Sequence, residues 1–231
     1  MNEQSVRNVA VIGLGQMGGS IARNLDRAGL LGAVWDPNPE TMATYSERGN
    51  VAVAPPADLP ADCRRLLFVV PGVAEIADCL TGPDAMLERM ESGGIILDLT
   101  TSDPDASGEL ATAAAARDVD YLDCGMTGGA AGADAGTMTL MIGGEARAIE
   151  DCADILAALT SRFFHVGPSG AGHTLKLIHN MVLHTMFLAN VEGVRMAAGM
   201  GIDPETVIEV FNAGNARSFV SEVRFPNHIL S

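Results

Sequence analysis

The stretch GAGHTLKLIHN, residues 170–180, contains Lys176, the only lysine of the chain, and Asn180 follows it by four residues. On a helix these two side chains lie one turn apart on the same face, so both can reach one ligand. Their neighbours are mostly apolar, and a poorly hydrated amine has a lowered pKa and can exchange protons near neutral pH, which a guanidinium cannot. We therefore predict that Lys176 is a catalytic acid/base; a solvated or snorkelling lysine is the alternative.

A second candidate region is the glycine-rich stretch 124–144, whose only charged residue is Asp134. We expect a loop here, because glycine tolerates unusual dihedral angles and lets backbone amides approach a ligand. The Thr127 hydroxyl beside the amides of Gly128 and Gly129 would suit a carboxylate. The alternative is a flexible surface loop without a ligand.

The N-terminal segment VRNVAVIGLGQMGGSIARNL predicts a nucleotide site, because GxGxxG stands between an expected buried strand and an expected helix. In this motif the glycines serve the tight turn, the approach to a pyrophosphate and the packing of helix on strand, and the helix amides face the anion. Asp36 ends the next expected strand and can accept hydrogen bonds from ribose hydroxyls while repelling a 2′-phosphate, which favours NAD over NADP. A plain strand–helix turn is the alternative. The residues of the fingerprint are Gly13, Leu14, Gly15, Gln16, Met17 and Gly18.

Alternating elements place these motifs in an α/β fold. Short apolar runs at 66–70, 95–99, 120–123 and 139–144 alternate with helical stretches, which predicts a Rossmann-type, doubly wound, mainly parallel sheet. Ligands of such sheets bind beyond the carboxyl ends of the strands, so the turns carrying Val70, Pro71 and Thr101 could line the nicotinamide side. Ordinary turn chemistry, with Ser102 or Asp103 capping a helix, is the alternative.

The remainder of the chain predicts helices. A helical pattern runs from about Gly170 to Gly199, long enough to link two bodies, and a capped helix follows from Asp203 and Pro204. We expect a dinucleotide-binding domain at 1–167, and a long linking helix with a partial, truncated all-α domain at 168–231.

Composition excludes several classes. The formal net charge of −15 argues against nucleic-acid and anionic-membrane partners. Without a long apolar run or a signal-peptide pattern, we expect a cytoplasmic protein. The four cysteines lie far apart, which predicts buried free thiols, and no metal is expected from the cysteine and histidine spacing. Apolar residues spread around the long helix predict a homo-oligomer, at least a dimer.

Three motifs in this order resemble the β-hydroxyacid dehydrogenase superfamily, which includes 3-hydroxyisobutyrate and 6-phosphogluconate dehydrogenases: GLGQMG, DCGMTGG and GAGHTLKLIHN. The resemblance implies that Lys176 is the general acid/base, that Asn180 positions it and the substrate, and that residues 127–129 bind the substrate carboxylate. It also implies that Pro71 and Thr101 lie against the nicotinamide.

Departures from the family pattern guide the choice of substrate. Thr127 stands where serine is usual, Gly125 and Met126 replace the more frequent proline and valine, and Leu183 stands where phosphogluconate enzymes carry a second acid. We therefore expect oxidation of a small 3-hydroxy acid. The alternatives are oxidative decarboxylation of a sugar acid, a dinucleotide-binding module without catalysis and, less favoured, an imine-reducing relative. Relatives of the hydroxyisobutyrate branch carry further C-terminal helices with a second active-site lysine, so a truncated helical domain is expected here.

Overall fold

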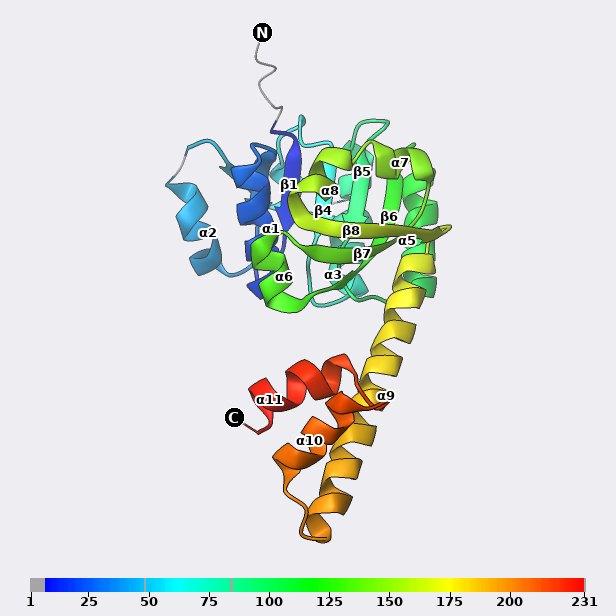
Figure 1. The fold of residues 1–231 in the computed structure, drawn as a ribbon. Coiled ribbons are helices and arrows are strands. Elements are labelled where there is room, and N and C mark those ends of the chain that lie inside the picture. Colours follow the sequence, from blue (N-terminus) through cyan, green and yellow to red (C-terminus); the bar gives the residue numbers. More distant parts are fainter. Residues whose placement is uncertain (1–6, 48, 84, 231) are drawn as a thin grey trace. The chain divides into compact units, whose positions relative to one another are not determined.

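The computed structural model describes residues 7–47, 49–83 and 85–230, and the chain divides into two compact units, residues 1–176 and 177–231 (Figure 1). The first unit holds the sheet, and the second is helical. The predicted division after residue 167 stays a prediction.

The first unit is built on an eight-stranded sheet with the strand order β3-β2-β1-β4-β5-β6-β7-β8. All neighbouring strands pair in parallel except β6 and β7, which are antiparallel, so the predicted mainly parallel sheet is confirmed. The chain moves outward from β1 to β3 and then returns to the other side of β1, which places the topological switch point at β1 and β4. The strands are β1 (Val9–Ile12), β2 (Leu31–Trp35), β3 (Ala52–Val53), β4 (Arg65–Phe68), β5 (Ile95–Asp98), β6 (Asp120–Thr127), β7 (Met138–Gly143) and β8 (Thr160–Gly167).

Helices cover both faces of this sheet (Figure 1). One apolar layer joins α1 and α8 to one face, and a second layer joins α3, α4 and α5 to the opposite face. Alternation along β1 divides its side chains between them, with Val9 and Val11 in the first layer and Ala10 and Ile12 in the second. The helical segments of this unit are α1 (Gln16–Arg27), α2 (Pro39–Ser46), η1 (Pro56–Asp58), α3 (Val73–Thr81), α4 (Met86–Arg89), α5 (Pro104–Ala115), α6 (Gly129–Ala135), α7 (Ala146–Glu150), α8 (Ala153–Leu159) and the start of α9 (Ala171–Gly199).

The glycine-rich stretch 124–144 is more regular than the predicted loop. Strand β6 continues to Thr127, α6 occupies 129–135, and β7 follows. The antiparallel ladder explains the difference, because Cys124 pairs with Ile142 and Met126 with Leu140, which pairs the backbone of this part of the stretch with β7. Strand β8 was also not predicted; most of its residues are exposed, so its sequence lacks a buried alternation.

The second unit contains the remainder of α9, α10 (Pro204–Ala213), a π-helical turn η2 (Val220–Arg224) and α11 (Phe225–His228). The predicted long helix and the following capped helix are confirmed, and the Asp203 side chain accepts a hydrogen bond from the Thr206 amide at 3.0 Å. A small core joins the helices, with the rings of Phe187 and Phe225 6.2 Å apart.

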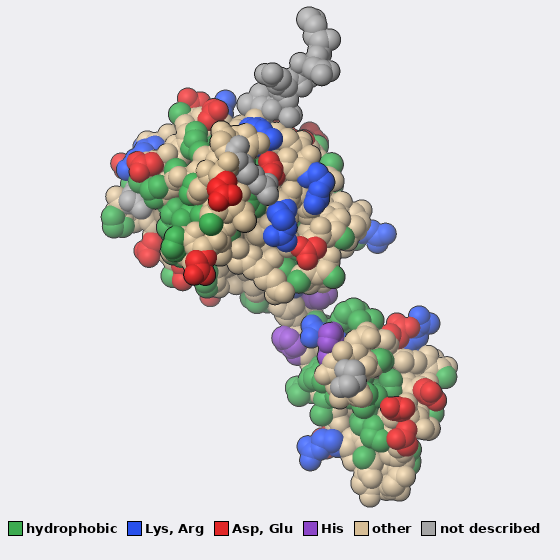
Figure 2. All heavy atoms as spheres, turned by 90° about the vertical axis from the view of Figure 1, so that its left-hand side faces the viewer, with side chains coloured by type: hydrophobic (Ala, Val, Ile, Leu, Met, Phe, Trp, Pro, Cys, Tyr) green, Lys and Arg blue, Asp and Glu red, His purple; other side chains and the backbone are tan. Residues whose placement is uncertain are grey.

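Charged side chains lie on the surface of the protein (Figure 2), whereas its cysteines are buried. On the face drawn in Figure 2, acidic side chains are spread among arginines and apolar residues. All four cysteines are buried thiols, as predicted, and burial raises the pKa of Cys63 to about 11 and that of Cys152 to about 12. Among the described residues, no helix combines the length and apolarity needed to cross a bilayer.

Candidate functional site

The turn between β1 and α1 has the geometry of a dinucleotide cradle. Gly13 has φ +94°, and a Cβ added there would lie 2.2 Å from the Val69 carbonyl oxygen. A Cβ on Gly18 would lie 1.9 Å from the Gly13 carbonyl oxygen, so helix and strand pack too closely for a side chain. Gly15 instead faces open space, with nothing within 4 Å of a Cβ. This glycine turn therefore fits the close approach of a pyrophosphate.

The N-terminus of α1 is suited to an anion. Its first-turn amides have no preceding intrahelical carbonyl partners, no side chain caps them, and the first turn carries no acidic residue. Gln16 is exposed, whereas Met17 packs partly into the core. Leu14 is buried, and its predicted contact with the cofactor stays a prediction.

Asp36, directly after β2, lies against the glycine turn. One carboxylate oxygen accepts a hydrogen bond from the Leu14 amide at 2.6 Å, and the other accepts from the Asn38 amide at 2.8 Å. Each oxygen keeps a further lone pair for a ligand hydroxyl. The structure thus brings together the glycines and the acidic residue of the predicted nucleotide site.

The turns after β4 and β5 meet at the same edge. The Val70 amide donates to the Thr100 hydroxyl at 3.3 Å, and the Val70 side chain lies beside Gly13. Thr101 and Pro71 are both exposed in these turns. Thr100 joins the two turns, and Asp103 caps α5 by accepting hydrogen bonds from the amides of Asp105 and Ala106.

Asp123 anchors the start of α9. This carboxylate is fully buried on β6, and its two oxygens accept hydrogen bonds from the amides of Gly170 at 2.7 Å and His173 at 2.8 Å. From the sequence, Asp123 is predicted only as the last residue of a strand and the first residue of the motif DCGMTGG. The available signal was chemical, because a carboxylate within a buried strand requires hydrogen-bond donors.

Two glycines let α9 approach β6. A Cβ on Gly125 would lie 2.6 Å from the Lys176 Cβ, and a Cβ on Gly172 would lie 2.2 Å from the Asp123 carbonyl oxygen. Because alternate residues of a strand point to one face, Asp123, Gly125 and Thr127 share the face that α9 covers. Strand β6 therefore supplies three groups in succession. Asp123 caps the start of α9, Gly125 leaves room for the Lys176 side chain, and Thr127 carries the hydroxyl that is predicted to bind the substrate.

Lys176 is half-buried where α9 packs against β6. Burial lowers the pKa of its ammonium below the ordinary value of 10.5. No hydrogen bond or ion pair of this ammonium is found within the part of the first unit that the structure describes. The neutral amine, which is the form required of a base, is therefore more accessible here than in a fully solvated lysine.

The predicted carboxylate site lies at the end of β6. Thr127 is two residues, about 7 Å of strand, beyond Gly125. Gly128 and Gly129 have φ +122° and +62°, and nothing lies within 4 Å of a Cβ on Gly129, so this backbone is open to a ligand. Asn180 belongs to the second unit, one helical turn after Lys176 on α9.

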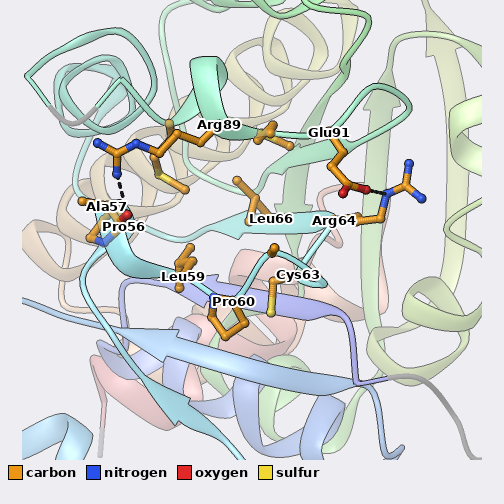
Figure 3. A pocket seen from close by; sticks show the side chains of 12 residues that line it. Pro56, Ala57, Leu59, Pro60, Cys63, Arg64, Leu66, Arg89 and Glu91 are labelled. Atoms are coloured by element: carbon orange, nitrogen blue, oxygen red, sulfur yellow. Dashed lines mark hydrogen bonds and ion pairs between the residues drawn. The ribbon is translucent and has the colours of Figure 1, made fainter.

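A separate cavity of about 60 Å³ lies where the chain enters β4, away from these turns (Figure 3). Its charged groups already have partners, since Arg89 donates to the Ala57 carbonyl and Arg64 pairs with Glu91 at 3.6 Å. It therefore adds nothing to the chemistry at the carboxyl edge. In the described ranges, no three potential metal ligands cluster.

Comparison with known proteins agrees with this architecture. A model of the NAD-binding domain of 6-phosphogluconate dehydrogenase matches residues 8–167, and a model described as NAD-binding of NADP-dependent 3-hydroxyisobutyrate dehydrogenase matches 170–231.

Individual relatives extend over nearly the whole chain. An L-threonate dehydrogenase of Cupriavidus necator is 32% identical over 97% of this chain and 75% of its own. A Dictyostelium discoideum protein named "Probable 3-hydroxyisobutyrate dehydrogenase, mitochondrial" is 30% identical over 98% of this chain and 70% of its own.

A solved structure, a 3-hydroxyisobutyrate dehydrogenase of Mycobacterium tuberculosis with L-serine, supports the fold with a TM-score of 0.87. It is 24% identical and covers 94% of this chain and 74% of its own. The glycine turn, the packing of Lys176 against β6 and the two family matches agree with one another. The chain belongs to the β-hydroxyacid dehydrogenase superfamily, whose members are nicotinamide-dependent oxidoreductases.

Proposed function

We propose that this chain is an NAD-dependent dehydrogenase that oxidises a small 3-hydroxy acid to the semialdehyde, or catalyses the reverse reduction. The observation that carries the proposal is the half-buried Lys176, which lies against Gly125 on the strand that ends at Thr127. A base with a lowered pKa beside an open backbone segment is suited to removing a proton from a substrate hydroxyl.

The cofactor is expected at the glycine turn, where NAD would accept hydride at C4 of its nicotinamide. The amides of residues 15–18 would hold the pyrophosphate, and Asp36 would accept from the ribose hydroxyls. The same carboxylate would disfavour the 2′-phosphate of NADP. Val70, Pro71 and Thr101 would lie on the nicotinamide side.

The substrate is expected between this edge and the lysine. The Thr127 hydroxyl and the amides of Gly128 and Gly129 would hold its carboxylate. Neutral Lys176 would take the hydroxyl proton during oxidation, and its ammonium would return that proton during reduction. Asn180 would position the lysine and the substrate.

The relatives support a hydroxy acid without selecting one. Both 3-hydroxyisobutyrate and L-threonate, named for the two relatives above, are small carboxylates with a hydroxyl on carbon three. A sugar acid is the second candidate, because the first family model describes 6-phosphogluconate dehydrogenase. Leu183 in place of an acidic residue weighs against it.

The decisive variant is Lys176→Met, with Lys176→Arg as a charged variant that cannot exchange the proton. Loss of a positioned acid/base lowers the rate by about 10²- to 10⁴-fold, so kcat of both variants should fall by that factor. The dissociation constant for NADH should stay within a few-fold, measured by quenching of Trp35, the only tryptophan, which precedes Asp36. Retention of most activity in either variant would refute the role of the lysine.

A substrate panel tests the reaction itself. It should include 3-hydroxyisobutyrate, L-threonate, L-serine, 4-hydroxybutyrate and 6-phosphogluconate, each with NAD and with NADP. Turnover of a 3-hydroxy acid with a preference for NAD is expected. Release of CO₂ from 6-phosphogluconate would select the decarboxylase, and NADH binding without any turnover would select a non-catalytic module.

We also propose a homodimer or higher assembly, because apolar side chains of α9 remain exposed. Met181 and Leu188 are 61% and 66% exposed. Large apolar surfaces of this kind mark protein interfaces. Sedimentation of a single species at the mass of one chain would contradict this.

A further inference from the structure

A cluster of buried polar side chains lies where α9 begins, and His173 stands at its centre. The ring is fully buried, and its Nδ1 lies 2.9 Å from the Ser107 hydroxyl oxygen. Ser107 donates its own proton to the Asp103 carbonyl at 3.0 Å. With its proton on the Asp103 carbonyl, the Ser107 oxygen is left to accept a hydrogen bond from His173 Nδ1–H.

The other ring nitrogen faces Asp98. His173 Nε2 lies 3.9 Å from Asp98 Oδ2 and has no hydrogen-bond partner among the described residues. A fully buried nitrogen without a partner costs free energy, so stability alone does not explain a histidine here. The position calls for another explanation.

Asp98 is the last residue of β5 and precedes the turn that is proposed to face the nicotinamide. It is fully buried and accepts hydrogen bonds from the Thr100 amide and the Tyr121 hydroxyl, both at 2.8 Å, and from the Ser102 hydroxyl at 3.5 Å. Burial raises the pKa of this carboxyl. Asp98 thus holds the backbone and side chains on both sides of Thr101.

His173 lies between the two segments that the proposed chemistry must align, which are the start of α9 and the turn after β5. Its ring contacts α5 and lies beside the turn after β5, while its amide donates to Asp123 on β6. Lys176 follows three residues later, on the same face of α9. Rotation or translation of the first turn of α9 would therefore move the lysine relative to the turn at 98–102.

We infer that His173 is a positioning residue, which ties the first turn of α9 to α5 and the turn after β5 and thereby sets where the Lys176 amine stands. This inference rests on the proposed function, because it gives Lys176 a catalytic task. His173 itself touches neither proposed ligand. Its contribution is to the distance between the lysine and the reacting carbon.

The test compares two variants with the intact chain. His173→Leu removes both ring nitrogens at similar volume, whereas the amide nitrogen of His173→Asn occupies the place of Nδ1 and can still donate to Ser107. Because a misplacement of 1 Å can cost about 10²-fold in rate, His173→Leu should lower kcat by roughly ten- to a hundredfold. His173→Asn should recover most of that loss. NADH binding, followed by Trp35 quenching, should change by less than about threefold in both.

A second pair of variants distinguishes loss of positioning from loss of stability. Ser107→Ala removes the same hydrogen bond from the opposite side and should lower kcat in the same direction. Leu110→Ala, a buried core change on the same helix α5, is the control for lost stability and should leave kcat unchanged at a temperature where it is folded.

The decisive comparison repeats His173→Leu in the Lys176→Met background, with the residual rate measured at high enzyme concentration. If His173 acts through the lysine, the second change should lower the residual rate by less than about twofold. An equal loss in both backgrounds, or no advantage of asparagine over leucine, would overturn the inference alone. An active Lys176→Met protein would overturn the proposed function, and the positioning role would fall with it.

Discussion

Gly125→Ala tests whether α9 lies against β6 as described. An added Cβ would stand 2.6 Å from the Lys176 Cβ and 2.9 Å from the Gly172 carbonyl oxygen. Non-bonded carbon atoms prefer a separation of about 3.5–4.0 Å, so the helix or the strand must move by roughly 1 Å. Gly125 itself does not have a positive φ, so alanine adds no backbone strain, and the whole effect comes from this contact.

The displacement sets two magnitudes. Overpacking of this kind costs about 1–3 kcal/mol. For a chain of this length each kcal/mol lowers Tm by about 2–4 °C, so a decrease of about 4–8 °C follows from 2 kcal/mol. The same 1 Å shift of the lysine should lower kcat by about 10²-fold. Thermal unfolding and steady-state oxidation of the best substrate measure the two effects.

Gly108→Ala is the matched control. Gly108 lies inside α5, and nothing lies within 4 Å of an added Cβ. Alanine there should stabilise the helix by about 0.5–1 kcal/mol and leave kcat unchanged. If Gly125→Ala behaved like this control, with wild-type Tm and kcat, the close approach of α9 to β6 would be refuted.

Two further predictions concern the contact between α9 and β6. Asp123→Asn replaces one acceptor with a donor, which leaves the amide of Gly170 or His173 unpaired and should cost about 1–3 kcal/mol in the free energy of unfolding. An unchanged denaturation midpoint would contradict the capping role. For Lys176, kcat/KM for oxidation should rise with pH and reach half its maximum below pH 10.5, because burial lowers the pKa, while reduction declines over the same range. The folded chain releases this proton at a lower pH than the unfolded chain, so the contribution of Lys176 to stability rises with pH between the two pKa values, which denaturation against Lys176→Met would detect.

The nucleotide half of the site could be predicted from sequence because its rules are local. The tight turn at Gly13 and the open position at Gly15 lie within one strand–turn–helix segment. Asp36 follows at the end of the next strand. The long helix α9 could be predicted for the same reason, since its helical pattern is continuous.

The support of the lysine could not be predicted in this way. Asp123 contacts residues 47 and 50 positions later, and His173 meets Ser107 across 66 positions. Such contacts depend on how β5, β6 and α9 pack, which no local spacing encodes. Strand β6 was predicted too short because glycine-rich composition indicates a loop, whereas pairing with β7 extends the strand to Thr127.

The contact between β6 and α9 also limits how the two segments can change in length. From Asp123 to Gly125 the strand advances about 6.7 Å, and from Gly172 to Lys176 the helix advances about 6 Å. The two intervals therefore have nearly the same length along the contact between β6 and α9. One residue inserted into the strand interval would reverse the face of every later side chain. One residue inserted into the helix interval would turn the amine by about 100° around the axis. The contact therefore constrains the lengths of these two intervals together, in addition to the residue types at Asp123, Gly125, Gly172 and Lys176.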